Sequence, residues 1–216
     1  MSQALAAPPA AASQNAGDRS VGPDDATLEE LVAANLSDPD APAVTPADLA
    51  VYPAFAPLSD AQRAEFLDLA GRHCFDPGET ILHEGRSTRS LWFILSGSCE
   101  VLKTLPNGED RVLATLEAGA LFGEMSFFSP APHSASVRAV SECVILRMGR
   151  ENWQTLEQIG LRPAYTIARE TASVMSDRLR RMDEWVTRVL ADTPDPAARA
   201  ARTDEWNDFR AKLLGG

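Results

Sequence analysis

The chain has 216 residues, of which 44% are hydrophobic and 24% charged, an ordinary composition for a globular protein. Its net charge of −11 argues against sequence-independent nucleic-acid binding and against docking on anionic membranes, because both need a basic surface. There is no apolar run of about 20 residues and no basic secretory start, so we expect a soluble, cytoplasmic protein.

Residues 1–51 are predicted to form a disordered acidic arm. The first 50 residues contain 14 alanines, 6 prolines and no aromatic residue, so they cannot bury enough apolar surface to offset chain entropy. One short helix is possible at residues 26–36, where Thr27 and Glu30 fit a capping box and the leucines share a face. This helix either packs transiently on its own domain or docks on a partner.

The folded domain is expected to span residues 52–191 and to begin with a short helix at 60–70, capped by Ser59. Short β-prone runs then alternate with turn residues at a regular spacing, which is typical of an antiparallel barrel or sandwich. Asn107-Gly108 predicts a type I′ hairpin turn, because both residues tolerate positive φ. The expected strands are residues 81–82, 91–95, 99–105, 111–116, 136–140 and 143–148.

The segment between Phe122 and Ala139 carries the candidate chemistry. Gly123 ends a strand and precedes one helical turn, so the backbone there can approach a ligand closely and its N–H groups favour an anion. Glu124 is an acceptor beside that anion position and suits a sugar hydroxyl. Ser134 and Ser136 can donate hydroxyl hydrogen bonds.

A long helix is predicted over residues 162–190, with Pro163 in its first turn. Apolar residues repeat along it at alternating spacings of four and three, which is the pattern of a coiled-coil seam. We interpret this seam as a dimerisation surface, the alternative being that it covers the barrel of its own chain. The remaining polar positions, Arg178 among them, are interpreted as solvated flanks. The dimer helix residues are Ala168, Ala172, Met175, Leu179, Met182 and Val186, within a seam that runs from Leu161 to Val189.

Residues 192–216 are predicted to be a linker followed by a terminal amphipathic helix at 204–214. The prolines at 194 and 196 break the long helix. Trp206 and Phe209 lie on one face of the last helix, which is expected to fold back on the domain or on a dimer mate.

Phe122-Gly123-Glu124, nine residues before His133–Val137, resembles the phosphate-binding cassette of cyclic nucleotide-binding domains, F-G-E-x-A-L followed by P-R-[AS]-A-[TS]-V. Further matches at 75–81, 84–85 and 91–97 extend the resemblance over about residues 55–190. The resemblance implies a mainly β fold with flanking helices (α+β). In that family an eight-stranded, jelly-roll-like antiparallel β-roll holds the nucleotide, and a long C-terminal helix covers it or pairs with a second subunit.

The resemblance also implies a ligand site for cAMP or cGMP. Gly123 would offer its N–H near the sugar phosphate, and Glu124 would accept from the ribose 2′-hydroxyl. The start of the short helix and the serines after it would contact the phosphate or the base side. The implied ligand-binding residues are Gly123, Glu124, Met125, Ser126, His133, Ser134 and Ser136.

His133 stands where the family has an arginine that pairs with the cyclic phosphate. Loss of one charge-assisted hydrogen bond costs roughly 1.5–3 kcal/mol, a 10- to 150-fold weakening. Three interpretations follow for His133: a weak phosphate ligand, part of a pocket that has lost cyclic nucleotide binding, or a contact for another ligand.

We therefore expect a regulatory protein that is not an enzyme and carries no metal or cofactor, since the sequence shows no H-x-H pair and no catalytic arrangement. It would act as a homodimer through a protein partner, reached by residues 25–36 or 204–214. The 26 residues after Leu190 include no basic recognition helix, so no DNA contact is expected. The alternative is a structural or adaptor subunit whose roll no longer binds cyclic nucleotide.

Overall fold

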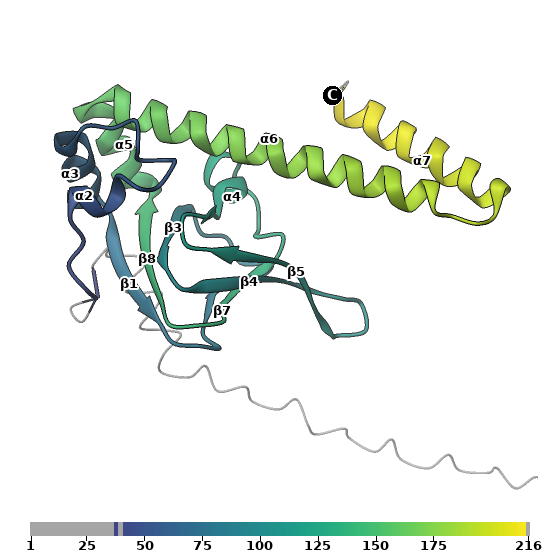
Figure 1. The fold of residues 1–216 in the computed structure, drawn as a ribbon, viewed down its shortest axis with the longest axis horizontal. Coiled ribbons are helices and arrows are strands. Elements are labelled where there is room, and N and C mark those ends of the chain that lie inside the picture. Colours follow the sequence, from purple (N-terminus) through teal and green to yellow (C-terminus); the bar gives the residue numbers. More distant parts are fainter. Residues whose placement is uncertain (1–36, 39–40, 215–216) are drawn as a thin grey trace, which may run out of the picture. The chain divides into compact units, whose positions relative to one another are not determined.

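The computed structural model describes residues 37–38 and 41–214, which belong to one unit of the chain (Figure 1). The predicted arm up to residue 36, with its helix at 26–36, lies outside the described residues. The folded part begins before residue 52, its predicted start. Helix α2 (Pro46–Leu49) has a capping box between Thr45 and Asp48, and Leu49 is fully buried. The prediction missed this capping box because it rested on the average composition of the first 50 residues.

Eight strands form two four-stranded antiparallel sheets, which confirms the predicted β-roll (Figure 1). Strands that are distant in sequence are neighbours in both sheets, because the chain crosses between the sheets as it proceeds. The first sheet has the order β1 (Gly71–Phe75), β8 (Cys143–Gly149), β3 (Ser90–Ser96) and β6 (Leu121–Phe122). The second has the order β2 (Thr80–Leu82), β7 (Ser136–Ala139), β4 (Ser98–Thr104) and β5 (Asp110–Glu117).

Helices cover the outer face of the first sheet. These are α3 (Asp60–Leu69), α5 (Arg150–Ile159) and the first turns of α6 (Leu161–Ala191). Side chains alternate along β3, so Leu91 and Phe93 enter the core against these helices, while Trp92 points to the opposite face, into the roll. The rings of Phe66 and Phe93 meet edge to face at 5.5 Å, and each buried aromatic or leucine contributes about 1.5–3 kcal/mol.

The β4–β5 hairpin differs from the predicted type I′ turn. The Gly108 N–H donates to the Leu105 carbonyl at 2.8 Å, which places Pro106 and Asn107 at the two central positions. A type I′ turn needs positive φ at both central positions, which the proline ring forbids. Gly108 instead takes the positive φ, 83°, one residue later. The prediction was wrong because it paired Asn107 with the glycine after it.

Helix α6 confirms the predicted long helix, and α7 (Pro196–Leu214) folds back beside its end (Figure 1). The terminal helix begins at Pro196 rather than at Asp204. The Asp195 carboxylate accepts from the Ala197 N–H at 3.1 Å, and Pro196 suits the first helical position. The alanine-rich residues 197–203, predicted to be linker, are good helix formers. In the described part of the chain, every helix is too short or too polar to cross a bilayer.

Two cysteine thiols lie in contact between the two sheets. Cys99 of β4 and Cys143 of β8 are fully buried, and their Sγ atoms lie 3.8 Å apart without a disulfide. Burial, with the neighbouring thiol, raises the pKa of Cys99 to about 12. The Cys99 thiol therefore stays protonated, and the Cys143 thiol lies within hydrogen-bond distance of the Ser98 and Ser141 carbonyl oxygens.

Candidate functional site

The candidate site is built around the turn from β6 into α4 (Glu124–Phe128). Gly123 makes this turn with φ 81°. A Cβ at this position would lie 2.5 Å from the Ser90 carbonyl oxygen and 2.9 Å from Trp92 Cδ1, so a larger residue would displace the cassette from β3. Among the residues that the structure describes, no side chain caps the N-terminus of α4. The turn thus has the backbone geometry that the sequence predicted.

His133 is turned into the protein. Its side chain is buried and lies between α4 and the loop before β3. The Thr88 N–H donates to Nε2 at 3.2 Å, and because an N–H only donates, Nε2 is the unprotonated nitrogen. Nδ1 then carries the proton and lies 3.0 Å from Ser126 Oγ. The Ser126 hydroxyl in turn donates to the Gly123 carbonyl. Burial also lowers the pKa of His133, so the neutral ring is favoured.

Glu124, the predicted sugar acceptor, is buried and already paired. Arg178 of α6 donates from Nη1 to Glu124 Oε1 at 2.6 Å and from Nη2 to the Leu121 carbonyl at 2.7 Å. The interpretation of Arg178 as a solvated flank was wrong. Arg178 lies on the same helix face as Ile167 and Thr171, which are buried against the domain. The i, i+4, i+11 spacing of these three residues is the sequence signal that could have predicted its position.

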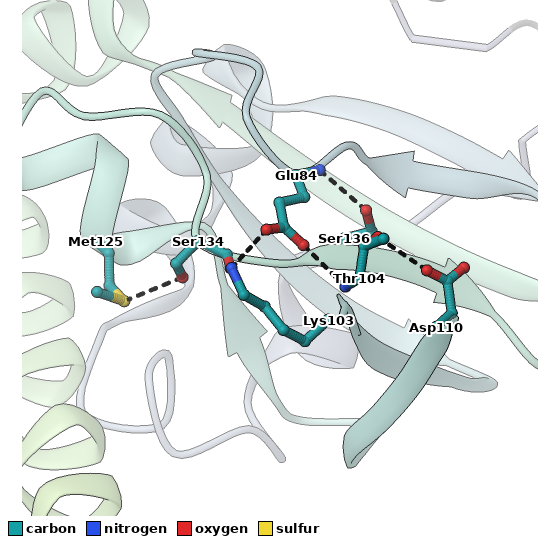
Figure 2. A network of polar contacts seen from close by, with 7 residues as sticks. All are labelled: Glu84, Lys103, Thr104, Asp110, Met125, Ser134 and Ser136. Atoms are coloured by element: carbon teal, nitrogen blue, oxygen red, sulfur yellow. Dashed lines mark hydrogen bonds and ion pairs between the residues drawn. The ribbon is translucent and has the colours of Figure 1, made fainter. Parts of the chain in front are cut away.

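The serines that follow the cassette belong to a polar network centred on Glu84 (Figure 2). The Glu84 N–H donates to Ser136 Oγ at 2.9 Å. Lys103 Nζ of β4 donates to Glu84 Oε1 at 2.5 Å and to the Ser134 carbonyl at 2.7 Å. The other oxygen, Glu84 Oε2, accepts from the Thr104 N–H at 3.1 Å, and the bond from Lys103 holds the pKa of Glu84 below its usual value.

The predicted site residues separate into two groups. Gly123, Glu124, Ser126 and His133 form one contiguous cluster at the start of α4. Ser134 joins it through its hydroxyl, 3.9 Å from Met125 Sδ, and Met125 is more than half exposed. The hydroxyl of Ser136 instead fixes the loop at Glu84. The sequence pattern did not reveal Arg178, Lys103 and Thr88, because each comes from a distant segment.

An apolar groove of about 610 Å³ lies outside the roll, between α4, α5 and α6. Phe128, Trp153 and Tyr165 line it, and Tyr165 is 66% exposed. Among the described residues, no three histidine, cysteine or acidic side chains are grouped so as to hold a metal ion. The groove is thus a second candidate ligand surface of the described domain, beside the cassette.

Comparison with known proteins agrees with this geometry. The cyclic nucleotide-binding domain model matches residues 72–158. The cAMP-activated global transcriptional regulator Vfr of Pseudomonas aeruginosa is 30% identical over 156 residues, 68% of this chain and 69% of that protein. The cyclic AMP receptor protein of Thermus thermophilus is 32% identical over 132 residues, 59% of each chain. This chain belongs to the cyclic nucleotide-binding domain family.

Solved structures show the same fold. The catabolite activator protein of Thermus thermophilus superposes with a TM-score of 0.56 at 29% identity, over 63% of this chain and 62% of that one. The N-terminal domain of a transcriptional regulator from Streptomyces coelicolor A3(2) gives 0.53 at 29% identity, over 63% and 93%. The chain spans 54% to 69% of the length of the bacterial regulators that it matches in sequence.

Proposed function

We propose that this chain is a non-enzymatic regulatory protein whose cassette binds cAMP or cGMP with weakened affinity, and which acts as a homodimer through a protein partner. The contact between Glu124 and Arg178 carries this proposal, because it links the cassette to the long helix directly. Relatives named as cAMP receptors, cAMP-activated regulators and kinase regulatory subunits support a regulatory rather than a catalytic role.

A ligand that binds Glu124 would alter the ion pair that attaches α6 to the cassette. Only 6% of the Glu124 side chain is exposed, and its Oε1 accepts from the Arg178 guanidinium. A ribose hydroxyl donating to the same carboxylate would compete with Arg178 or share the carboxylate with it. Ligand binding and the position of α6 are then linked, since each ligand state favours one arrangement of the ion pair.

The exposed face of α6 supports a dimer. The α6 residues that are buried in the domain include Ala164, Ile167 and Thr171, none of which belongs to the predicted seam. Along the seam, Leu179 is 58% exposed and Met182 is 43% exposed. Of the six predicted dimer-helix residues, Ala168 packs against the core of its own domain, while Met175, Leu179 and Met182 are exposed. A second copy of α6 would bury this apolar row, and the seam continues at Tyr165 into the groove beside α5.

Output to a protein partner is proposed for the two segments predicted from sequence. The first, residues 25–36, lies outside the described residues. The second, residues 204–214, forms the second half of α7, where the Trp206 and Phe209 rings lie 5.5 Å apart and Phe209 is about half exposed. A half-buried tryptophan beside an exposed phenylalanine suits a protein contact.

The adaptor alternative rests on a specific observation, the engagement of both ring nitrogens of His133. The protein itself thus provides the hydrogen-bond partners of the side chain that replaces the phosphate-binding arginine. Under this hypothesis the roll is a packing module, and replacing His133 with arginine restores binding.

The test combines ligand titration with the dimer equilibrium. Calorimetry with cAMP and with cGMP at about pH 6 and about pH 8 measures binding to the wild type and to His133→Arg. Analytical ultracentrifugation with and without saturating nucleotide then measures the dimer dissociation constant of the wild type, Arg178→Met and Arg180→Met. Arg180 is the matched control, because its ion pair with Asp177 is exposed on the same helix.

For a regulator, nucleotide shifts the wild-type dimer constant about tenfold or more, equivalent to about 1.4 kcal/mol of coupling. The shift persists in Arg180→Met and disappears in Arg178→Met. Binding without any shift contradicts the regulatory proposal. Absence of wild-type binding at both pH values, with binding in His133→Arg, establishes the adaptor.

A further inference from the structure

The cassette lacks a cation at residue 133, and a cyclic phosphodiester carries one negative charge that needs a partner. His133 is buried, and its Nε2 accepts from the Thr88 N–H. We infer that Lys103 of β4 supplies the phosphate-binding cation, in the role that the cassette arginine has in the family. This inference rests on the proposed function. This assigns a ligand contact to a strand that the cassette motif does not include.

The position of Lys103 carries the inference. Its side chain runs from β4 to the loop between α4 and β7 and ends between Glu84 and Ser134 (Figure 2). Nζ lies 2.7 Å from the carbonyl oxygen of Ser134. The hydroxyl of the same residue faces Met125 Sδ, in the first turn of α4. The Lys103 ammonium therefore contacts the same cassette residue whose hydroxyl faces the Met125 side chain of α4.

Two arginines near the cassette bind other groups. Arg178 binds Glu124 and the Leu121 carbonyl on the sugar side. Arg89 Nη2 donates to the Phe127 carbonyl at 3.3 Å, toward the C-terminal end of α4. Neither guanidinium contacts the loop between α4 and β7, whereas Lys103 does.

The bonding of Lys103 leaves it able to meet an anion. Lysine has three N–H donors, and Glu84 Oε1 and the Ser134 carbonyl accept two of them. Both Glu84 oxygens are engaged, by Lys103 and by the Thr104 N–H, so the carboxylate fixes the ammonium in place. The same carboxylate offsets part of the charge, so the resulting site is weaker than one with a free arginine.

The experiment measures binding of cAMP and of cGMP by calorimetry to the full chain of four proteins: wild type, Lys103→Met, Arg138→Met and His133→Arg. Arg138 is the matched control, because it forms a half-buried ion pair with Glu100 in the same sheet. We expect Lys103→Met to bind cAMP about 10-fold or more weakly and Arg138→Met to bind as the wild type does. Melting temperatures of all four proteins verify that they are folded.

A second measurement needs no variant. If Lys103 meets the phosphate, wild-type affinity falls between about 0.01 M and about 1 M ionic strength, where the screening length drops from about 30 Å to about 3 Å. An unchanged wild-type affinity overturns the inference, even if Lys103→Met fails to fold.

The outcomes distinguish failure of the Lys103 inference alone from failure of the proposed function. Equal binding by the wild type and Lys103→Met overturns the role of Lys103 and leaves the regulatory proposal intact. Binding by His133→Arg alone overturns both, because Lys103 then does not replace the arginine and the natural pocket is closed. Absence of binding by all four proteins overturns both as well.

Discussion

The backbone N–H of Thr88 donates to Nε2 of His133 across 3.2 Å, and this contact fixes the protonation state of the imidazole. The ring is a hydrogen-bond acceptor on the Thr88 side and a donor toward Ser126. A second proton on Nε2 would face an N–H donor, so the charged form is disfavoured where the family places a permanent charge. His133 therefore stabilises two loops of the unliganded domain.

Replacing His133 with arginine should reverse this balance. Without ligand, the variant loses the contacts to Thr88 and Ser126 and buries a charge, which we expect to cost about 1–3 kcal/mol. With cAMP the guanidinium gains a phosphate partner, so ligand should raise its melting temperature more than that of the wild type. The same substitution at His83, outside the cassette, should not change the response to ligand. An equal response of wild type and His133→Arg would contradict the prediction.

The cassette glycine should be far less replaceable than another glycine of similar backbone conformation. Gly123→Ala places a Cβ 2.5 Å from the Ser90 carbonyl oxygen, whereas Gly78 has φ 95° and nothing within 4 Å. Both variants carry the strain of positive φ, about 1–2 kcal/mol. Gly123→Ala adds overpacking of about 1–3 kcal/mol. Urea unfolding measures the difference, and equal losses for the two variants would count against it.

The seam on α6 predicts a defined effect on assembly. Leu179→Asp places a charge in the exposed apolar row and should raise the dimer dissociation constant on the order of 100-fold, about 3 kcal/mol. Ser173→Asp adds the same charge at an exposed position outside the seam and should leave the constant unchanged. Sedimentation velocity measures both. A Leu179→Asp protein that dimerises like the wild type would refute the seam.

Stability should fall as the solution becomes acidic, because of His73. Burial, with the nearby Arg147, lowers the pKa of His73 to about 4 in the folded protein, and Asp38 opposes this shift. The unfolded chain titrates near 6.5, so it binds a proton between these values that the folded protein does not. The contribution of His73, about 3 kcal/mol, is complete above about pH 6.5 and is lost toward about pH 4.

Urea unfolding across this pH range measures the slope. His73→Gln should flatten it, leaving the smaller effect of His133, whose pKa is shifted in the same direction. An identical pH dependence in His73→Gln and the wild type would show that other groups control acid stability.

Local patterns predicted six of the eight described strands, because alternation of apolar side chains and glycine turns act over a few residues. The predicted strands did not include β1 and the two-residue β6. The same locality explains the failures. Arg178 reaches Glu124 across 54 residues of sequence, and no periodicity specifies its partner. The cassette motif located His133 but not the direction of its ring, which Thr88 decides from a loop 45 residues away. The hairpin prediction failed because Pro106 overrides the preference of its neighbours.

The two buried thiols between the sheets allow opening of the roll to be measured. Cys99 and Cys143 belong to different sheets and have no exposed surface, so a thiol reagent reaches them only when the sheets part. The labelling rate of these two cysteines therefore reports how often the closed shell opens, with partly exposed Cys74 as the internal reference for unhindered reaction. A nucleotide that binds inside the roll would slow that rate in proportion to its occupancy.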